Sequence, residues 1–238
     1  MTGGRVLDER ELTGRAESHL VELPGGGYLQ APAAAALAAL QADAERAGFK
    51  LAIASAYRSF DRQRVIFNGK LAGERATYAD SGERVDIAAL PRKLALEAVL
   101  RYSAMPGTSR HHWGTDLDVY DAAAVPADYR VQLSPDEVAP DGVFGPLHDW
   151  LDRRMAADSS HGYFRPYASD RGGVAPERWH LSYAPLATTC AARLTAPVVL
   201  RSWDEAGGVS WRDEIDARLG ELLERYVAVP PGWCPAPG

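Results

Sequence analysis

The chain has 238 residues, of which 46% are hydrophobic and 24% charged, and its formal net charge is −6. This length suits one well-filled domain or two small ones, and the composition excludes a disordered or fibrous chain. With this negative net charge, the sequence shows no basic region of the kind that binds nucleic acid. The pair Arg153–Arg154 is interpreted as a solvated helix face. We therefore expect no nucleic-acid partner.

The sequence shows no segment that would direct the protein to a membrane or anchor it there. The first twenty residues contain no apolar run of signal-peptide length, and no stretch approaches the roughly 18 apolar residues that span a bilayer. We expect no membrane span. As written, the sequence predicts a cytoplasmic location, whereas a missing true start would allow a periplasmic or cell-envelope one.

Two cysteines occur, Cys190 and Cys234, and they form no CxxC pair. A thiolate zinc site or a disulfide framework is therefore not expected. The sequence leaves open whether the two thiols pair with each other or are both inert.

In the first half of the chain the pattern alternates between helices and one strand. The predicted elements are a helix over 31–48, a buried strand over 50–55, a helix over 60–72, a loop over 77–83 and a helix over 94–102. Gly48 is expected to end the first helix, and Val65 and Ile66 are predicted to face inward from the second.

The second half mixes strands and helices. The predicted elements are a strand over 115–120, a long loop over 122–142, an amphipathic helix over 146–156, a strand over 179–183, a helix over 215–226 and an irregular Pro-rich tail. Because regular βαβ alternation is missing, the pattern favours an α+β fold over a doubly wound sheet.

The first candidate for chemistry is the segment from Ser109 to Asp118, in which His111 precedes Asp118 by seven residues across a turn at Gly114. Zinc accepts imidazole nitrogen and carboxylate oxygen at about 2.0–2.2 Å. On spacing alone, His112 could replace His111 as a ligand. The simpler alternative is a surface loop with capping polar residues.

Strand alternation adds a second observation about this segment. Asp116 and Asp118 share one face of the predicted strand, while Leu117 and Val119 share the other. The apolar pair should face the core and the carboxylates a cleft. Because neighbouring carboxylates repel each other unless a cation lies nearby, the pair favours a metal site.

The second candidate is the segment from Glu177 to His180. A catalytic zinc keeps three protein ligands and leaves one position for water, so His180 could be the third ligand. Glu177 precedes it by three residues and could accept a proton from that water. Alternatively, Glu177 is a surface acid paired with Arg178. Trp179 is expected to point into the core.

The third candidate is Arg58, which follows the predicted strand over 50–55. Its guanidinium could bind a carboxylate with two parallel hydrogen bonds, or stabilise a developing oxyanion. The simpler alternative is a structural or solvated arginine.

Together these segments resemble the VanY-type D-alanyl-D-alanine carboxypeptidases, which are LAS metallopeptidases with the hedgehog/DD-peptidase fold. The resemblance covers about residues 48–186. It is carried by three motifs in the family's order, namely SxHxxGxxxD (Ser109, His111, Gly114, Asp118), ExWH (Glu177, Trp179, His180) and SxYRS with a following Gln (Ser55, Tyr57, Arg58, Ser59, Gln63).

The resemblance implies a single zinc peptidase domain over residues 1–238, with a small antiparallel sheet flanked by helices and with helical extensions at both ends. It also implies the site residues. By resemblance the zinc ligands are His111, Asp118 and His180, and the general base is Glu177. Arg58 would contact the substrate, with Gln63 in a supporting role. Ser109 would orient the loop or contact the substrate.

One residue departs from the family pattern. The family often has a small residue two positions before the ligand Asp, where this chain has Asp116. Two roles stay open: Asp116 orients His111 or another ligand from outside the metal's own ligand set, or it alters the substrate pocket. His19, His148 and His161 match no motif and are expected to be surface or hydrogen-bonded histidines.

The implied activity is removal of D-alanine from peptidoglycan stem peptides or from precursors that end in D-Ala-D-Ala. Alternatives within the fold are an L,D-carboxypeptidase and a peptidoglycan endopeptidase. A non-catalytic zinc-containing binding module is a further alternative, against which the presence of Glu177 and Arg58 argues. A serine hydrolase is disfavoured because no GxSxG element accompanies the histidines.

Overall fold

The computed structural model describes residues 5–229. At its centre lies a four-stranded antiparallel sheet, whose strands in spatial order are β3 (Leu51–Ser55), β4 (Asp116–Asp121), β6 (His180–Tyr183) and β5 (Tyr163–Phe164). A separate antiparallel pair consists of β1 (Leu20–Glu22) and β2 (Tyr28–Gln30). The prediction of an α+β fold with a small antiparallel sheet is confirmed.

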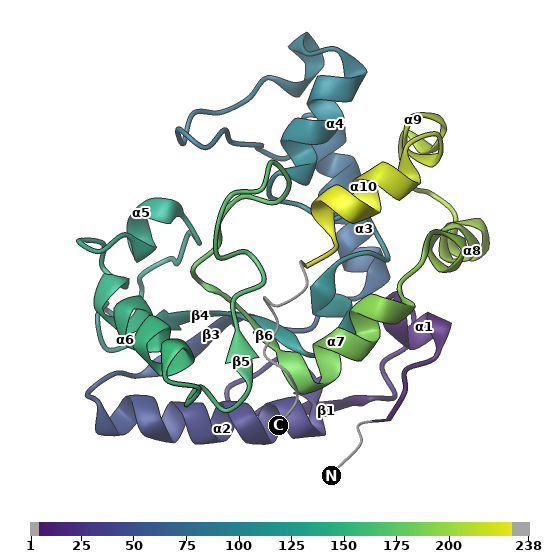
Figure 1. Ribbon diagram of the computed structural model, residues 1–238. Helices are drawn as coiled ribbons and strands as arrows, with labels where there is room; N and C mark the ends of the chain where they lie inside the picture. Colours follow the sequence, from purple (N-terminus) through teal and green to yellow (C-terminus); the bar gives the residue numbers. More distant parts are fainter. Residues whose placement is uncertain (1–4, 230–238) are drawn as a thin grey trace.

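Helices surround this sheet (Figure 1). They are α1 (Glu9–Leu12), α2 (Ala31–Arg46), α3 (Phe60–Leu71), α4 (Arg92–Leu100), α5 (Pro135–Val138), α6 (Gly145–Ala156), α7 (Ala184–Arg193), α8 (Ala196–Ala206), α9 (Arg212–Asp216) and α10 (Leu219–Tyr226), with 3₁₀ turns η1 (Ile87–Ala89) and η2 (Arg110–Trp113). Across 5–229, no helix combines the length and apolar character that crossing a membrane requires.

One face of the sheet is apolar and packs on α2, the long helix that runs beneath it in Figure 1. Leu117 and Val119 of β4 are fully buried there, as is Leu181 of β6. On α2 the inward residues Leu37 and Leu40 lie at helical spacing and are also buried. The predicted apolar face of β4 is therefore confirmed, and burial on this scale contributes about 1.5–3 kcal/mol for each large aliphatic side chain.

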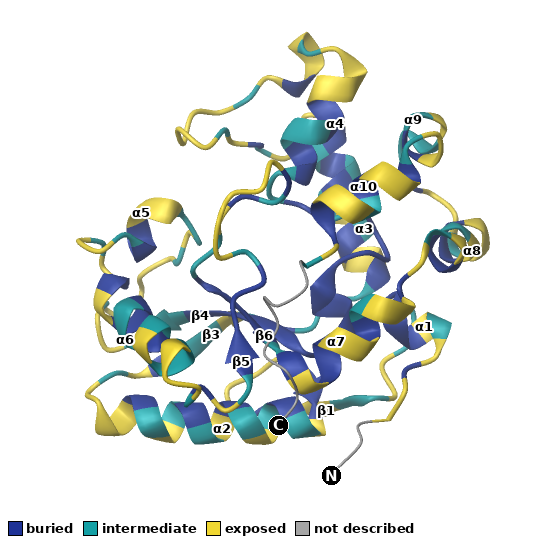
Figure 2. Cartoon of the chain, viewed as in Figure 1, coloured by how far each residue is buried: buried dark blue, intermediate teal, exposed yellow. Residues whose placement is uncertain are grey.

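A second apolar cluster joins the remaining helices, and Figure 2 shows their buried sides turned toward one another. It contains Leu7 near the start of the described chain, Phe67 of α3, Trp113 of η2 and Tyr226 of α10. Residues from both ends of the described chain thus share one core with the middle.

Helix α3 corrects one prediction. Besides Gly69, its buried residues are Phe60, Gln63, Phe67 and Leu71, one to each turn along a single face. Val65 lies on the opposite face and is 52% exposed, so the inward orientation predicted for Val65 is wrong. The aromatic residues, which bury more surface than Val65, determine which side of the helix faces the core.

The predicted helix over 215–226 is two helices, α9 and α10, because Arg218 at the junction has φ −122° and ψ 5° and leaves the helical region. The predicted loop over 122–142 contains α5, which begins at a capping box formed by Ser134 and Glu137. Helices α1, α7 and α8 and strands β1, β2 and β5 were not predicted.

That residues 1–238 form a single domain stays a prediction, which the unfolding of a core variant can test. Trp203 of α8 is 1% exposed, and its indole Nε1 donates to the Pro106 carbonyl at 2.7 Å, just before η2. We expect Trp203→Ala to lower the free energy of unfolding by about 3–5 kcal/mol, since it removes a large buried side chain. Denaturant unfolding followed by fluorescence and by circular dichroism should show one shared transition.

Val65→Ala, at an exposed position of α3, is the control and should change the free energy of unfolding by less than about 0.5 kcal/mol. Two separate transitions, with only one of them moved by Trp203→Ala, would show that the C-terminal helices form an independent unit.

Candidate active site

The pairing of β4 with β6 brings two of the predicted site residues together. In this antiparallel register Asp118 lies directly opposite His180, and Asp116 lies opposite Ser182. These polar side chains share the face of the sheet that points away from α2, because side chains alternate along a strand. All four residues are at most 3% exposed.

His111 reaches the same place from the 3₁₀ turn η2. Gly114 ends this turn in the left-handed region, with φ +65°, and a Cβ there would lie 2.4 Å from the Leu20 side chain. Only glycine fits this position without displacing a neighbour. The chain can therefore turn sharply from His111 into β4.

These three residues form a compact triangle of possible ligand atoms. One nitrogen or oxygen from each of His111, Asp118 and His180 lies within 4.8 Å of the others. Nε2 of His111 is 3.4 Å from Oδ2 of Asp118, and Nδ1 of His180 is 3.2 Å from Oδ1 of the same carboxylate. That Oδ1 is buried, and its contact with His180 is not a well-aligned hydrogen bond.

The two neighbouring histidines are held differently. Nδ1 of His111 lies 2.8 Å from the Ala56 carbonyl and donates to it, which leaves Nε2 facing Asp118. Burial lowers the pKa of His111 to about 4, so its imidazole is neutral and has a lone pair to offer.

His112 has both ring nitrogens occupied by the backbone. Its Nδ1 donates to the Arg58 carbonyl at 2.6 Å, and its Nε2 accepts from the Gly107 N–H at 3.0 Å. His112 is therefore a neutral histidine that ties η2 to the chain around Arg58. This arrangement favours His111 over His112 as a ligand.

Glu177 lies beside the triangle, with Oε2 3.6 Å from Nδ1 of His180 and its side chain 13% exposed. Its backbone N–H donates to the Tyr167 carbonyl at 3.0 Å, which fixes the loop before β6. Burial, and to a lesser degree the Asp118 carboxylate, raises the pKa of Glu177 to about 7 against the opposing effect of His180. A carboxyl with this pKa can exchange a proton near neutral pH.

Arg58 comes from the end of β3. A bulge between Ile53 and Ser55 brings Ser55 into register with Asp118. The guanidinium donates to Gln63 Oε1 at 2.9 Å and to Ser55 Oγ at 3.2 Å, while Gln63 itself donates to the Ala104 carbonyl at 2.7 Å. Burial lowers the pKa of Arg58, but arginine stays charged at neutral pH. Gln63 thus orients Arg58, and its supporting role toward a substrate stays a prediction.

Ser109 is 4% exposed and precedes η2, where its carbonyl accepts from the His112 N–H at 3.1 Å. Its hydroxyl makes no capping bond to that turn. The Ser109 backbone therefore shapes the loop, and its hydroxyl is left to other partners.

Lys70 is a residue of the site that sequence reasoning missed. It lies two turns after Gln63 on α3, and its positive charge acts to lower the pKa of Glu177. The seven-residue spacing from Gln63 could have indicated it. Tyr167 ends the aromatic-rich segment 161–167, for which the sequence leaves open a place in the peptide cleft or in a packed loop. Its ring stands edge-on to the His180 ring, with centroids 5.0 Å apart.

The other histidines differ from the expectation in part. His161 is exposed and pairs with Asp43 at 2.9 Å, as predicted of a surface histidine. His148 is buried, and its Nδ1 lies 3.4 Å from Nη2 of Arg165, as expected of a hydrogen-bonded histidine. The His19 side chain is instead buried without a hydrogen-bond partner at either ring nitrogen among the described residues. Burial lowers the pKa of both rings, so each is neutral.

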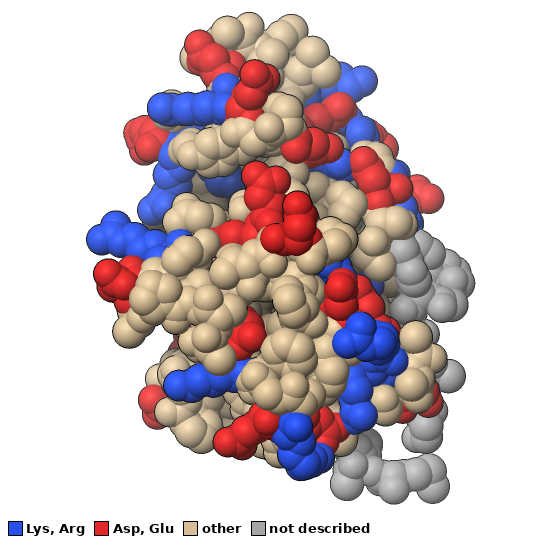
Figure 3. Space-filling model, turned by 90° about the vertical axis from the view of Figure 1, so that its left-hand side faces the viewer, with Lys and Arg blue, Asp and Glu red and all other residues tan. Residues whose placement is uncertain are grey.

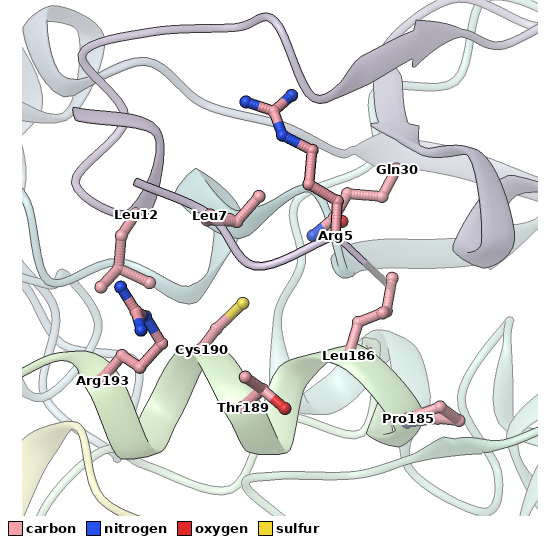
Figure 4. Close-up of a pocket in the computed structure, with 9 residues that line it drawn as sticks. All are labelled: Arg5, Leu7, Leu12, Gln30, Pro185, Leu186, Thr189, Cys190 and Arg193. Atoms are coloured by element: carbon pink, nitrogen blue, oxygen red, sulfur yellow. The ribbon is translucent and has the colours of Figure 1, made fainter. Parts of the chain in front are cut away.

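A separate small cavity lies between α7 and the N-terminal segment (Figure 4). Cys190 points into it from α7, toward Leu7 and Gln30. Its volume of about 40 Å³ has room for only a few water molecules. Burial raises the pKa of the Cys190 thiol to about 12, which makes it unreactive, whereas Cys234 lies outside the described residues.

Charges of both signs are interspersed on the face shown in Figure 3. Many described arginines are paired with acids, for example Arg101 with Asp80 and Asp170.

Comparison with known proteins identifies the class. Residues 26–186 match the family model described as VanY, D-alanyl-D-alanine carboxypeptidase. That range contains every site residue described above, and it covers more than half of the chain. The chain is therefore a peptidase. More particularly, it belongs to the VanY family.

Two related proteins have names that state no activity. An uncharacterized protein of Haemophilus influenzae is 41% identical over 103 residues, which is 42% of this chain and 70% of that protein. A second one is 28% identical over 119 residues, which is 50% of this chain and 89% of that protein.

Among solved structures, a variant of the vancomycin-resistance D,D-pentapeptidase VanY in complex with Zn(II) has a TM-score of 0.49 and 22% identity, and the match covers 73% of this chain and 86% of that one. The LD-carboxypeptidase LdcB has a TM-score of 0.47 and 22% identity, covering 79% of this chain and 78% of the other.

The raised pKa of Glu177 generates a prediction for protein treated with a chelator. A folded-state pKa of about 7, above the usual 4.5, means that stability falls as pH rises through this window. Glu177→Gln should remove that fall, so that the variant gains up to roughly 3 kcal/mol relative to wild type between pH 5 and pH 8. Urea unfolding at the two pH values measures the difference.

Glu45→Gln on the exposed side of α2 is the control and should track wild type. An equal pH dependence in wild type and Glu177→Gln would mean that Glu177 is already ionised at pH 5 in the folded protein.

Proposed function

We propose that the protein is a zinc-dependent carboxypeptidase that removes the terminal D-alanine from peptidoglycan stem peptides or precursors ending in D-Ala-D-Ala. The observation that carries this proposal is the buried triangle of His111, Asp118 and His180 with Glu177 beside it. Membership of the VanY family supports the substrate class.

The donor set fits zinc. Two imidazole nitrogens and one carboxylate oxygen are the ligand types of catalytic zinc sites, which keep a fourth position open. The Asp118 carboxylate and the neutral ring of His111 offer lone pairs for such an ion. Zinc held there would act as a Lewis acid toward the scissile carbonyl and would acidify a water molecule.

Glu177 then serves as the general base. It takes a proton from the attacking water and later donates it to the departing amine of D-alanine. Its pKa of about 7 suits both directions of transfer at neutral pH. Lys70 keeps this pKa from rising further, because its charge favours the ionised carboxylate.

Arg58 is the proposed contact for the substrate's terminal carboxylate. Its half-buried side chain is held in place by Gln63 and Ser55, so little freedom is lost on binding. The same group could instead stabilise the oxyanion of the reacting carbonyl.

Two other activities remain alternatives within the family fold, L,D-carboxypeptidase and endopeptidase. The terminal residue's configuration and the need for a free carboxylate distinguish them from the proposed reaction.

The central test separates metal binding from chemistry. We expect His180→Ala to lose zinc and activity together, because it removes a ligand. Glu177→Gln should retain about one zinc but lose activity by about 10²–10⁴-fold, since only the base is removed. Metal analysis and release of D-alanine from a D-Ala-D-Ala peptide, measured by mass spectrometry, give both readouts.

His161→Ala, which changes a surface histidine, should match wild type in both measurements. Full activity in folded, zinc-loaded Glu177→Gln protein would remove Glu177 from the mechanism, and unchanged zinc content in His180→Ala would overturn the ligand assignment.

The substrate proposal is tested by amidating the peptide's C-terminus. A carboxypeptidase should lose most of its activity on the amide, because the half-buried Arg58 charge is left without its partner. If Arg58 binds the carboxylate in ground and transition states alike, Arg58→Lys should mainly raise KM, whereas loss of an oxyanion contact should mainly lower kcat. Equal cleavage of the amidated peptide at an internal bond would identify an endopeptidase.

A further inference from the structure

The site contains a second carboxylate, Asp116, that lies outside the ligand triangle. It is 0% exposed and shares the polar face of β4 with Asp118. Its Oδ1 accepts from Nε2 of His180 at 2.9 Å, on the side of the imidazole ring away from Nδ1, which faces Asp118. Asp116 is therefore placed to hold the ring and not to join the ligand set.

Every oxygen of Asp116 is occupied. Oδ1 also accepts from Nε of Arg110 at 2.8 Å, and Oδ2 accepts from the Thr115 hydroxyl at 2.5 Å. The Arg110 guanidinium in turn donates to Ser182 Oγ at 2.7 Å. A fully buried carboxylate requires such compensation, because an uncompensated buried charge costs several kcal/mol.

Arg110 is itself fixed by packing. Its side chain is 2% exposed, and the guanidinium carbon lies 4.7 Å from the centroid of the Trp113 ring. Arg110 and Trp113 belong to η2, the turn that also carries His111. One buried network thus connects the turn that bears His111 to the ring of His180.

We infer that Asp116, held by Arg110, is a positioning residue that fixes the His180 ring with Nε2 as donor and Nδ1 as the lone pair available to a metal. This inference rests on the proposed function, since it assigns Asp116 a role toward the proposed zinc. It also assigns a use to the aspartate found where the related carboxypeptidases often have a small residue.

The alternative role for Asp116, a change to the substrate pocket, is disfavoured by its contacts. Its carboxylate is enclosed by His180, Arg110 and Thr115 and has no exposed surface. A side chain without exposed surface cannot contact a peptide unless the site rearranges.

The experiment measures zinc affinity by competition with a chromophoric chelator. Asp116→Asn keeps the size of the side chain but removes the charge that orients the imidazole, and the expected loss of zinc affinity is about 10–100-fold. Cobalt(II) in place of zinc provides a second readout, because its visible absorption reports ligand geometry and should differ from that of wild type.

Asp116→Asn leaves Arg110 without its buried counter-charge and could therefore unfold. The double variant Asp116→Ala/Arg110→Met removes both charges and should fold, since replacing a buried ion pair with apolar groups is often tolerated. It should show the same loss of zinc affinity, with a metal-free melting temperature close to that of wild type.

Thr115→Val is the matched control, because it removes a partner of Asp116 but leaves the bond to His180. Its zinc affinity should stay within about threefold of wild type, well short of the loss that removal of an orienting partner causes. If the folded double variant binds zinc as tightly as Thr115→Val and wild type, Asp116 is not a positioning residue. If wild type itself binds no zinc, the proposed function fails instead.

Discussion

The antiparallel pairing of β4 with β6 is the constraint on which the rest of the site depends. It places Asp118 opposite His180, although the two residues are far apart in the sequence. The same register places Leu117 opposite Leu181 on the other face, against α2. A slip of one residue would move both apolar side chains out of the core, so the hydrophobic core holds the polar pair in register.

Burial of so many polar groups on one face has a physical cost, and hydrogen bonds offset most of it. His111 donates to the Ala56 carbonyl, His112 is bonded to backbone at both nitrogens, and Asp116 is bonded at both oxygens. Within this set, Oδ1 of Asp118 faces Nδ1 of His180 at 3.2 Å. Two imidazoles and one carboxylate thus lie close enough together to be considered as ligands of one ion.

Patterns in neighbouring residues were sufficient to predict features that depend only on neighbouring residues. Alternation along 115–120 predicted the two faces of β4, and motif resemblance selected residues that the structure brings together around Asp118. The Arg110–Asp116 network was not predictable, because it depends on the register between strands distant in sequence. Helices α7 and α8 were missed although both begin with Ala-Pro, and proline in the first turn is a signal of a helix start.

The loop that carries Glu177 also contacts α10, which lies outside the residues 26–186 that match the family. This loop is held by Arg101, which binds Asp170 and the Gly173 carbonyl and whose own carbonyl accepts from the Ala175 N–H. From the other side Arg225 of α10 donates to the Gly172 carbonyl, and a Cβ on Gly173 would lie 1.9 Å from the Arg225 carbonyl oxygen. This close packing leaves the loop little room to shift. The C-terminal helices therefore contribute to the site without supplying a reacting group, because they restrict the backbone that presents the proposed base.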